Sequence, residues 1–213
     1  MSVLAEDEKI IKLSKKDISQ CTRILTEAFI DDPLFKYVFT GKNRKKTIEY
    51  FLKFMLTASI SLGELAIGIV KDSEIVGVAL VEKPIGIHGI KLFTKPFFLV
   101  RLFLFFIIIP NKSLRLINEQ VKHTNSVRPK KPHYYGQYLA VSPKHRKKGL
   151  ATKLLNYIHG IADKDTQSVG MALDTENNNN LRLYNEHGYR LTSEWEYGDL
   201  IIYSMFRERN ITE

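Results

Sequence analysis

Residues 139–152 read LAVSPKHRKKGLAT, and this stretch decides how the rest of the chain is interpreted. Its first three residues end an apolar run typical of a strand, Ser142 and Pro143 close that run, and an amphipathic helix begins near Gly149. The N-terminus of a helix leaves backbone N–H groups without internal partners and carries partial positive charge. This strand–loop–helix junction therefore predicts a binding site for a phosphate or a diphosphate.

The residue types in this loop support the same prediction. Gly149 has no Cβ, so the backbone can approach a ligand closely, and Ala151 keeps the first helical turn small. The run Lys144–Lys148 adds positive charge around the junction. Neither G-x-x-x-x-G-K-[ST] nor G-x-G-x-x-G occurs in the sequence, which argues against a P-loop and against a dinucleotide fingerprint.

A second segment, residues 177–189, reads NNNNLRLYNEHGY. Together with Arg146-Lys-Lys-Gly149-Leu-Ala151, it resembles the two signatures of the GNAT superfamily of acetyl-CoA-dependent N-acyltransferases. The first signature is Q/R-x-x-G-x-G/A after the fourth strand. The second is an asparagine followed by L-Y-x-x-x-G-F, with Tyr189 here in the place of phenylalanine. The resemblance is specific over about Tyr134 to Phe206 and only compatible in pattern before that.

The resemblance implies a set of residues that bind acetyl-CoA. The diphosphate would lie on backbone N–H groups of the loop, and the pantetheine arm would run beside residues 139–141, where two central strands splay apart. Asn177, Asn180 or both would hydrogen-bond the pantetheine amides. The alternative is that this asparagine run is an ordinary polar loop and helix cap. The implied residues are Leu139, Ala140, Val141, Arg146, Lys147, Lys148, Gly149, Leu150, Ala151, Thr152, Asn177, Asn180 and Tyr184.

The implied chemistry is direct attack of an uncharged amine on a thioester. Tyr184 matches the tyrosine that protonates the departing thiolate, and its alternative role is that of a core aromatic. Relatives often carry the base at positions matching Tyr135 or Gln137, and neither residue here is a carboxylate or a histidine. His133 and Asp174 are the candidate bases. A water chain and an amine of low pKa remain as alternatives, as does a role for His133 as a polar residue at the start of a strand.

The segment Asp31-Asp32-Pro33-Leu34 lies where relatives line the acceptor pocket. Its carboxylates can attract a cationic amine. The alternative is a turn that ends the preceding helix and keeps its acids in solvent.

Strands alternate with helices along the chain, and hairpins occur near both ends. We expect an α/β (α+β) GNAT fold, with a mixed central sheet of six or seven strands, flanking helices and splayed central strands. One domain would span residues 1–213, with 1–132 as the acceptor side and 133–213 as the acetyl-CoA-binding core. The expected strands are residues 8–13, 65–70, 75–81, 133–141, 167–173, 189–195 and 200–206. The expected helices are residues 14–29, 45–59, 92–122 with a break at Pro110, 149–162 and 181–187.

Composition excludes several classes of protein. Hydrophobic residues make up 44% and charged residues 26%, which are values of an ordinary globular protein rather than of a disordered one. The lone Cys21 cannot form an internal disulfide, and no metal-ligand spacing occurs, so no metal is expected. The net charge of +9 favours anionic partners. The basic runs are not interleaved with aromatic residues, so we expect no nucleic-acid partner.

The most apolar stretch, residues 96–109, reads PFFLVRLFLFFIII. It is shorter than the roughly 20 residues of a membrane span, so no span is expected. It is interpreted as a buried or substrate-covering helix. The alternative is a segment that docks on a membrane surface or a partner, since Lys91, Lys95 and Arg101 flank or interrupt it. The acidic N-terminus shows no signal peptide, so a cytoplasmic location is expected.

These observations predict an acetyl-CoA-dependent N-acetyltransferase that acts on a primary amine of a small molecule. The N-terminal part most resembles a small-molecule branch that includes antibiotic acetyltransferases. One alternative is a protein N-terminus or a lysine as acceptor. The other is a non-catalytic sensor of acyl-CoA. The sequence leaves a homodimer open.

Overall fold

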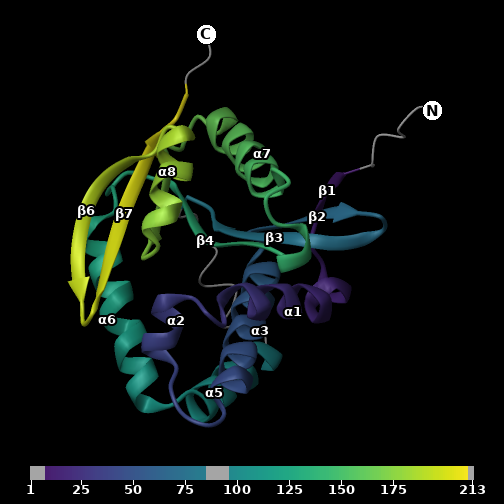
Figure 1. The fold of residues 1–213 in the computed structure, drawn as a ribbon, viewed down its shortest axis with the longest axis vertical. Helices are drawn as coiled ribbons and strands as arrows, with labels where there is room; N and C mark the ends of the chain where they lie inside the picture. Colours follow the sequence, from purple (N-terminus) through teal and green to yellow (C-terminus); the bar gives the residue numbers. More distant parts are fainter. Residues whose placement is uncertain (1–7, 85–95, 211–213) are drawn as a thin grey trace.

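The computed structural model describes residues 8–84 and 96–210, without the side chains of residues 96–101. Seven strands form one mixed sheet in the order β1-β2-β3-β4-β5-β7-β6 (Figure 1). Only the central pair β4–β5 is parallel, and every other neighbouring pair in this sheet is antiparallel. The strands are β1 (Lys9–Lys12), β2 (Leu65–Lys71), β3 (Glu74–Glu82), β4 (Tyr134–Val141), β5 (Gly170–Thr175), β6 (Arg190–Tyr197) and β7 (Leu200–Glu208). The expectation of six or seven strands in a mixed sheet is confirmed.

Helices cover both faces of the sheet, as Figure 1 shows. On one face lie α1 (Ile18–Phe29), α2 (Pro33–Val38), α3 (Arg44–Leu62), α5 (Pro96–Ile108) and α6 (Asn111–Val127). On the other face lie α7 (Leu150–Lys164) and α8 (Asn178–Glu186). The short 3-10 helices η1 (Lys15–Asp17) and η2 (Pro143–His145) precede α1 and α7. Each face has its own apolar core, so the sheet is buried on both sides where α1, α3 and α7 pack.

Several boundaries differ from those read from the sequence. The helix α2 was not expected, although Asp32 caps it and Pro33 occupies its first turn, which is the usual start of a helix. Strand β5 begins at Gly170 rather than at residue 167, because Ser168 forms a turn with both backbone groups of Gly170. The absence of a signal peptide rests partly on residues 1–7, and the expected start of a helix at 92–95 and the flanking Lys91 and Lys95 also lie outside the described residues.

The centre of the sheet is irregular in two ways that matter for the site. Leu80 pairs with Tyr138 and Val81 with Gly136, so Gln137 is an extra residue, a β-bulge in β4. Strands β4 and β5 pair only from Tyr134 to Gly136 on the β4 side, while β4 stays paired with β3 up to Val141. The second half of β4 therefore has an open edge toward β5, as the family resemblance implied.

Candidate active site

The loop between β4 and α7 has the backbone of an anion site. After η2 the chain turns through Lys147, whose φ is +59°, and Gly149, whose φ is +75°. Gly149 is the N-cap of α7, and Leu150 begins the helix. Left-handed conformations close to a helix start direct successive N–H groups toward one point. Glycine adopts this conformation without steric cost, which is a second reason for its presence besides close approach.

The N–H groups of this loop are available to a ligand. Within the described residues, no backbone hydrogen bond uses the N–H groups of residues 147–152, and Lys153 is the first of α7 to donate, to the Gly149 carbonyl. A Cβ built on Gly149 meets nothing within 4 Å, so the space in front of the loop is open. Exposed Arg146, Lys147 and Lys148 surround that space with positive charge. The loop therefore fits a diphosphate.

The open edge of β4 leads from this loop to a cavity of about 440 Å³. Side chains from both faces of the sheet line the cavity, because it lies where β4 and β5 separate. Its walls are mostly aromatic and aliphatic, a composition that suits a small-molecule site. The apolar lining includes Phe29, Phe35, Phe39, Phe51, Met55, Phe105, Ile117 and Tyr138. The polar lining includes Asp32, Gln120, Thr124, Tyr135, Gln137, Asp174, Glu176, Asn180 and Tyr184.

The bulge in β4 directs two neighbouring side chains toward the same wall of this cavity. Ser59 of α3 hydrogen-bonds to Gln137 at 3.5 Å, and Tyr138 packs edge-on against Phe29 and Phe35. Without the extra residue, one of the two side chains would point to the other face of the sheet. Leu139, two residues after the bulge, also lines the cavity.

Tyr184 projects from α8 into the cavity from the side opposite to α3. Burial, with the nearby charge of Glu176 as a smaller cause, raises the pKa of its hydroxyl to about 12. The phenol is therefore protonated at neutral pH and able to donate a proton. Within the described residues, Tyr184 forms an edge contact with the ring of Tyr189, and the Tyr184 hydroxyl makes no hydrogen bond.

A pair of carboxyl groups, Asp32 and Glu176, lies in the same cavity. Burial, a hydrogen bond to Asp32 and the charge of Asp32 raise the pKa of Glu176 to about 9. Glu176 therefore keeps its proton at neutral pH and donates it to the Asp32 carboxylate. Asp32 also accepts a hydrogen bond from the Phe35 N–H at 3.1 Å, so it caps α2 and faces the cavity at once. Burial and the charges of this pair also raise the pKa of Tyr138.

The two candidate bases named from the sequence lie in different places. Asp174 lines the cavity, but its carboxylate already accepts hydrogen bonds from Tyr135 Oη at 3.0 Å and from Thr124 Oγ1. The structure places His133 just before β4 and outside the cavity lining, with Nδ1 2.8 Å from the Lys131 carbonyl. Glu176 was missed, although it follows Asp174 by two residues and therefore points the same way at the end of β5.

The asparagines at the start of α8 are not equivalent. Asn177 is the N-cap, and its side chain accepts a hydrogen bond from the Asn179 N–H at 3.0 Å. Asn180 lines the cavity, and its amide donates to Thr175 Oγ1 at 3.3 Å. Asn180 is thus closer than Asn177 to the place expected for the pantetheine arm.

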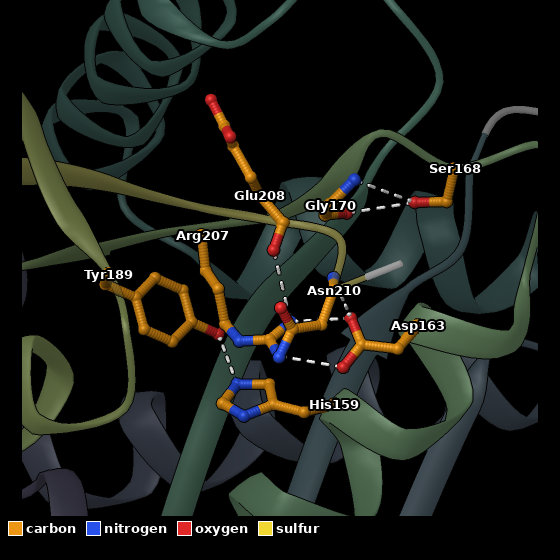
Figure 2. A network of polar contacts seen from close by, with 8 residues as sticks. All are labelled: His159, Asp163, Ser168, Gly170, Tyr189, Arg207, Glu208 and Asn210. Carbon is orange, nitrogen blue, oxygen red and sulfur yellow. Dashed lines mark hydrogen bonds and ion pairs between the residues drawn. The ribbon is translucent and has the colours of Figure 1, made fainter. Parts of the chain in front are cut away.

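A second hollow lies beside α7, and several of its polar groups pair with one another (Figure 2). Arg207 of β7 makes two hydrogen bonds of 2.8 Å to the Asp163 carboxylate, which also accepts the Asn210 N–H. His159 hydrogen-bonds to Tyr189 Oη at 2.9 Å, and burial lowers its pKa to about 4. These contacts tie α7 to β7 and to Tyr189 just before β6, and they give the paired groups a structural role.

Other expectations can be compared with the described residues. Cys21 is buried, and burial together with the charge of Asp17 raises the pKa of its thiol to about 12, so it is unreactive. Over residues 8–84 and 96–210, His, Cys, Asp and Glu form no group of three that could hold a metal ion. No helix over the same ranges combines the length and the apolar character needed to cross a bilayer.

Comparison with known proteins agrees with the two sequence signatures. A family model described as an acetyltransferase (GNAT) domain matches residues 113–191, which include the loop, Asn180 and Tyr184. No protein in a search of curated sequences matches significantly.

Solved structures resemble the whole chain. Arylalkylamine N-acetyltransferase 2 from Aedes aegypti has a TM-score of 0.69 at 18% identity, over 96% of this chain and 100% of that one. A histone acetyltransferase HPA2 and related acetyltransferase from Corynebacterium glutamicum has a TM-score of 0.68 at 19% identity, covering 96% and 98%. PaiA N-acetyltransferase from Thermoplasma acidophilum, in complex with coenzyme A, has a TM-score of 0.59 at 16% identity, covering 95% and 99%.

The expected GNAT fold is thus confirmed. At these identities the structural likeness establishes the fold, and the matched domain adds the acetyltransferase signature at the loop and at α8. Residues 113–191 therefore match a GNAT acetyltransferase domain, and the chain as a whole has the GNAT fold.

Proposed function

We propose that the chain acetylates the primary amine of a small molecule whose body is apolar and about the size of one aromatic ring system. The observation that carries this proposal is the pairing of an aromatic cavity with the Asp32–Glu176 carboxyl pair. Apolar walls favour an apolar body, and a single shared negative charge favours one ammonium group. A polyamine would place further charges against apolar walls, which is unfavourable.

The loop and the open edge of β4 would hold the donor. Backbone N–H groups of residues 147–152 are free to bind its diphosphate, and residues 139–141 leave an edge for its amides. Arg146, Lys147 and Lys148 would add charge, and Asn180 would bond an amide of the arm. Bound acetyl-CoA would supply the thioester that the amine attacks.

The carboxyl pair would bind the amine and take its proton. An ammonium entering the cavity is stabilised by the Asp32 carboxylate. A carboxyl with a pKa of about 9, such as Glu176, is close in basicity to an alkylamine, whose pKa is about 10. Glu176 would first release its own proton to solvent, and the resulting carboxylate can then accept the ammonium proton and leave an uncharged amine. Matching of this kind is what general-base catalysis requires.

Tyr184 would act at the other end of the reaction. Its hydroxyl is protonated, buried and in the same cavity as the carboxyl pair. It can donate a proton to the sulfur that leaves when the C–S bond breaks. Asp174 would hold Tyr135 and α6 in place rather than act as the base, since both hydrogen bonds to it come from the cavity wall.

Release of free thiol from acetyl-CoA, measured with a panel of acceptors, tests the proposal. The panel contains phenethylamine, tryptamine, a straight-chain alkylamine, spermidine, a peptide with a free N-terminus and a lysine peptide. We expect kcat/KM to be highest for the two arylalkylamines. A preference for either peptide would favour the protein-acceptor alternative, and binding of acetyl-CoA without turnover of any amine would favour the sensor.

A further inference from the structure

The helix α5 presents an apolar face to solvent. Phe103, Phe106 and Ile107 are 67%, 56% and 62% exposed, and Leu104 and Ile108 are also exposed. On the opposite side of the helix, Phe105 is buried, lines the cavity and packs against Phe54 with ring centroids 4.5 Å apart. The inner face thus covers the cavity, as expected, and accounts for the fold of this segment. It does not account for the apolar outer face. Exposed apolar patches of this kind mark interaction sites.

Exposed basic side chains lie on the segments that adjoin α5. Lys112, the second residue of α6, follows the end of α5 by four residues and is exposed. Ser113 Oγ donates to the Val38 carbonyl at 2.7 Å, so the start of α6 lies against the end of α2, just before the exposed Lys42.

The first turn of α3 belongs to the same region. Lys45 and Lys46 are exposed there, about two turns before Phe51 and Phe54, which contact Phe105 of α5. Figure 1 shows α5 and the start of α6 at the end of the molecule opposite to α7. This basic region is therefore separate from the diphosphate loop, whose charges the proposed function already uses.

We propose that α5 and these lysines form a docking face for the surface of an anionic lipid bilayer. Phe103, Phe106 and Ile107 would enter the boundary between headgroups and acyl chains, and Lys45, Lys46 and Lys112 would pair with lipid phosphates and carboxylates. Apolar and basic residues on one surface are the combination that binds such membranes. With 13 residues, α5 is too short to span a bilayer, so it lies on the membrane.

A second copy of the chain fits this face less well. In a two-fold dimer the same patch meets itself, so the interface would bring two sets of these lysines into one region. Like charges brought together in this way oppose association, whereas an anionic surface is complementary to them.

Co-sedimentation of the full chain with vesicles tests the docking face. One set of vesicles is phosphatidylcholine alone, and the other is an equimolar mixture of phosphatidylcholine and phosphatidylserine. We expect binding to the mixed vesicles that weakens as salt is raised. The variant Phe103→Ser/Phe106→Ser should bind about 100-fold more weakly, since each buried ring contributes about tenfold. Its matched control, Leu191→Ser/Ile201→Ser, removes two exposed apolar side chains from β6 and β7 and should bind as the parent does.

The lysines are tested in the same assay. Lys45→Glu/Lys46→Glu should weaken binding to the mixed vesicles by at least about tenfold, at roughly 1 kcal/mol for each basic residue. Lys130→Glu/Lys131→Glu, at the far end of α6, is the control with the same change in net charge. Thermal unfolding of every variant shows whether it has folded.

The proposal is overturned if the mixed vesicles do not bind the parent chain, or if the phenylalanine variant binds them as well as the parent does. It is also overturned if ultracentrifugation shows a dimer that depends on Phe103 and Phe106 while no vesicle binds. None of these readouts depends on acetyl transfer.

Discussion

Replacing Gly149 by alanine tests the diphosphate loop against a control that the chain itself provides. Gly149 and Gly63 both cap a helix, with φ of +75° and +77°, and a Cβ on either meets nothing within 4 Å. The steric strain of alanine in this conformation is therefore the same at both positions, about 1 kcal/mol. For a chain of this size, that strain lowers Tm by roughly 2–4 °C.

The two variants should differ only in ligand binding. A Cβ at position 149 enters the space in front of the N–H groups of residues 147–152, so at least one hydrogen bond to a charged phosphate is lost. Such a bond contributes about 1.5–3 kcal/mol, which corresponds to a loss of about 10-fold to 100-fold in affinity.

Calorimetric titration with coenzyme A measures the effect directly. We expect Gly63→Ala to bind as the parent does and Gly149→Ala to bind at least about tenfold more weakly, at equal cost in Tm. Equal affinity of the two variants would show that the loop does not hold the diphosphate.

Four further predictions concern the cavity and the second hollow. Tyr184→Phe should lower kcat by about 100-fold, the usual contribution of a general acid, with little change in coenzyme A affinity measured by calorimetry. For the parent, kcat/KM should rise with pH toward the pKa of Glu176, about 9, and Asp32→Asn should shift this limb to lower pH, because Asp32 raises that pKa. Arg207→Ala removes two hydrogen bonds from a partly buried carboxylate, so Tm should fall by roughly 5 °C, at about 2 kcal/mol. His159 should stay neutral until about pH 4, as its NMR titration would show.

The signs of these pH effects follow from proton binding. Between its ordinary pKa of 6.5 and about 4, His159 binds a proton in the unfolded chain but not in the folded one. Stability should therefore fall as pH drops through this window, by up to about 3 kcal/mol from this group. A His159 resonance that titrates near 6.5 would contradict the burial argument. If the pH dependence of kcat/KM is the same in Asp32→Asn as in the parent, the coupling of the two carboxyls is contradicted. Normal turnover in Tyr184→Phe would exclude the role of Tyr184 as the acid.

Patterns of neighbouring residues in the sequence predicted the loop at Gly149 and most of the strands. The loop at Gly149 was predicted because helix starts, glycine conformation and charge all follow from neighbouring residues. Apolar and β-branched runs predicted every strand but β5 to within two residues, and β4 differs from its expected range only by His133. The bulge at Gln137 was not predicted, because it depends on the register against β3, which no local pattern contains.

The acceptor side of the site was predicted less completely. Asp32 was considered both as a cap and as an acid that meets the amine, and the structure gives it the cap and a place in the cavity. Its partner Glu176 lies just after β5, far along the chain, and only the tertiary fold joins them. The basicity of Glu176 depends on burial and on that partner, so neither could be inferred from the residue itself.

A crystal structure of the chain with acetyl-CoA tests the central claim most directly. We predict that the diphosphate lies on the N–H groups of residues 147–152 and that the arm follows the open edge of β4. The thioester sulfur should then lie within hydrogen-bonding reach of Tyr184 Oη, facing Asp32 and Glu176. A diphosphate bound elsewhere, for example beside Arg207 in the second hollow, or a thioester outside the cavity would contradict the account.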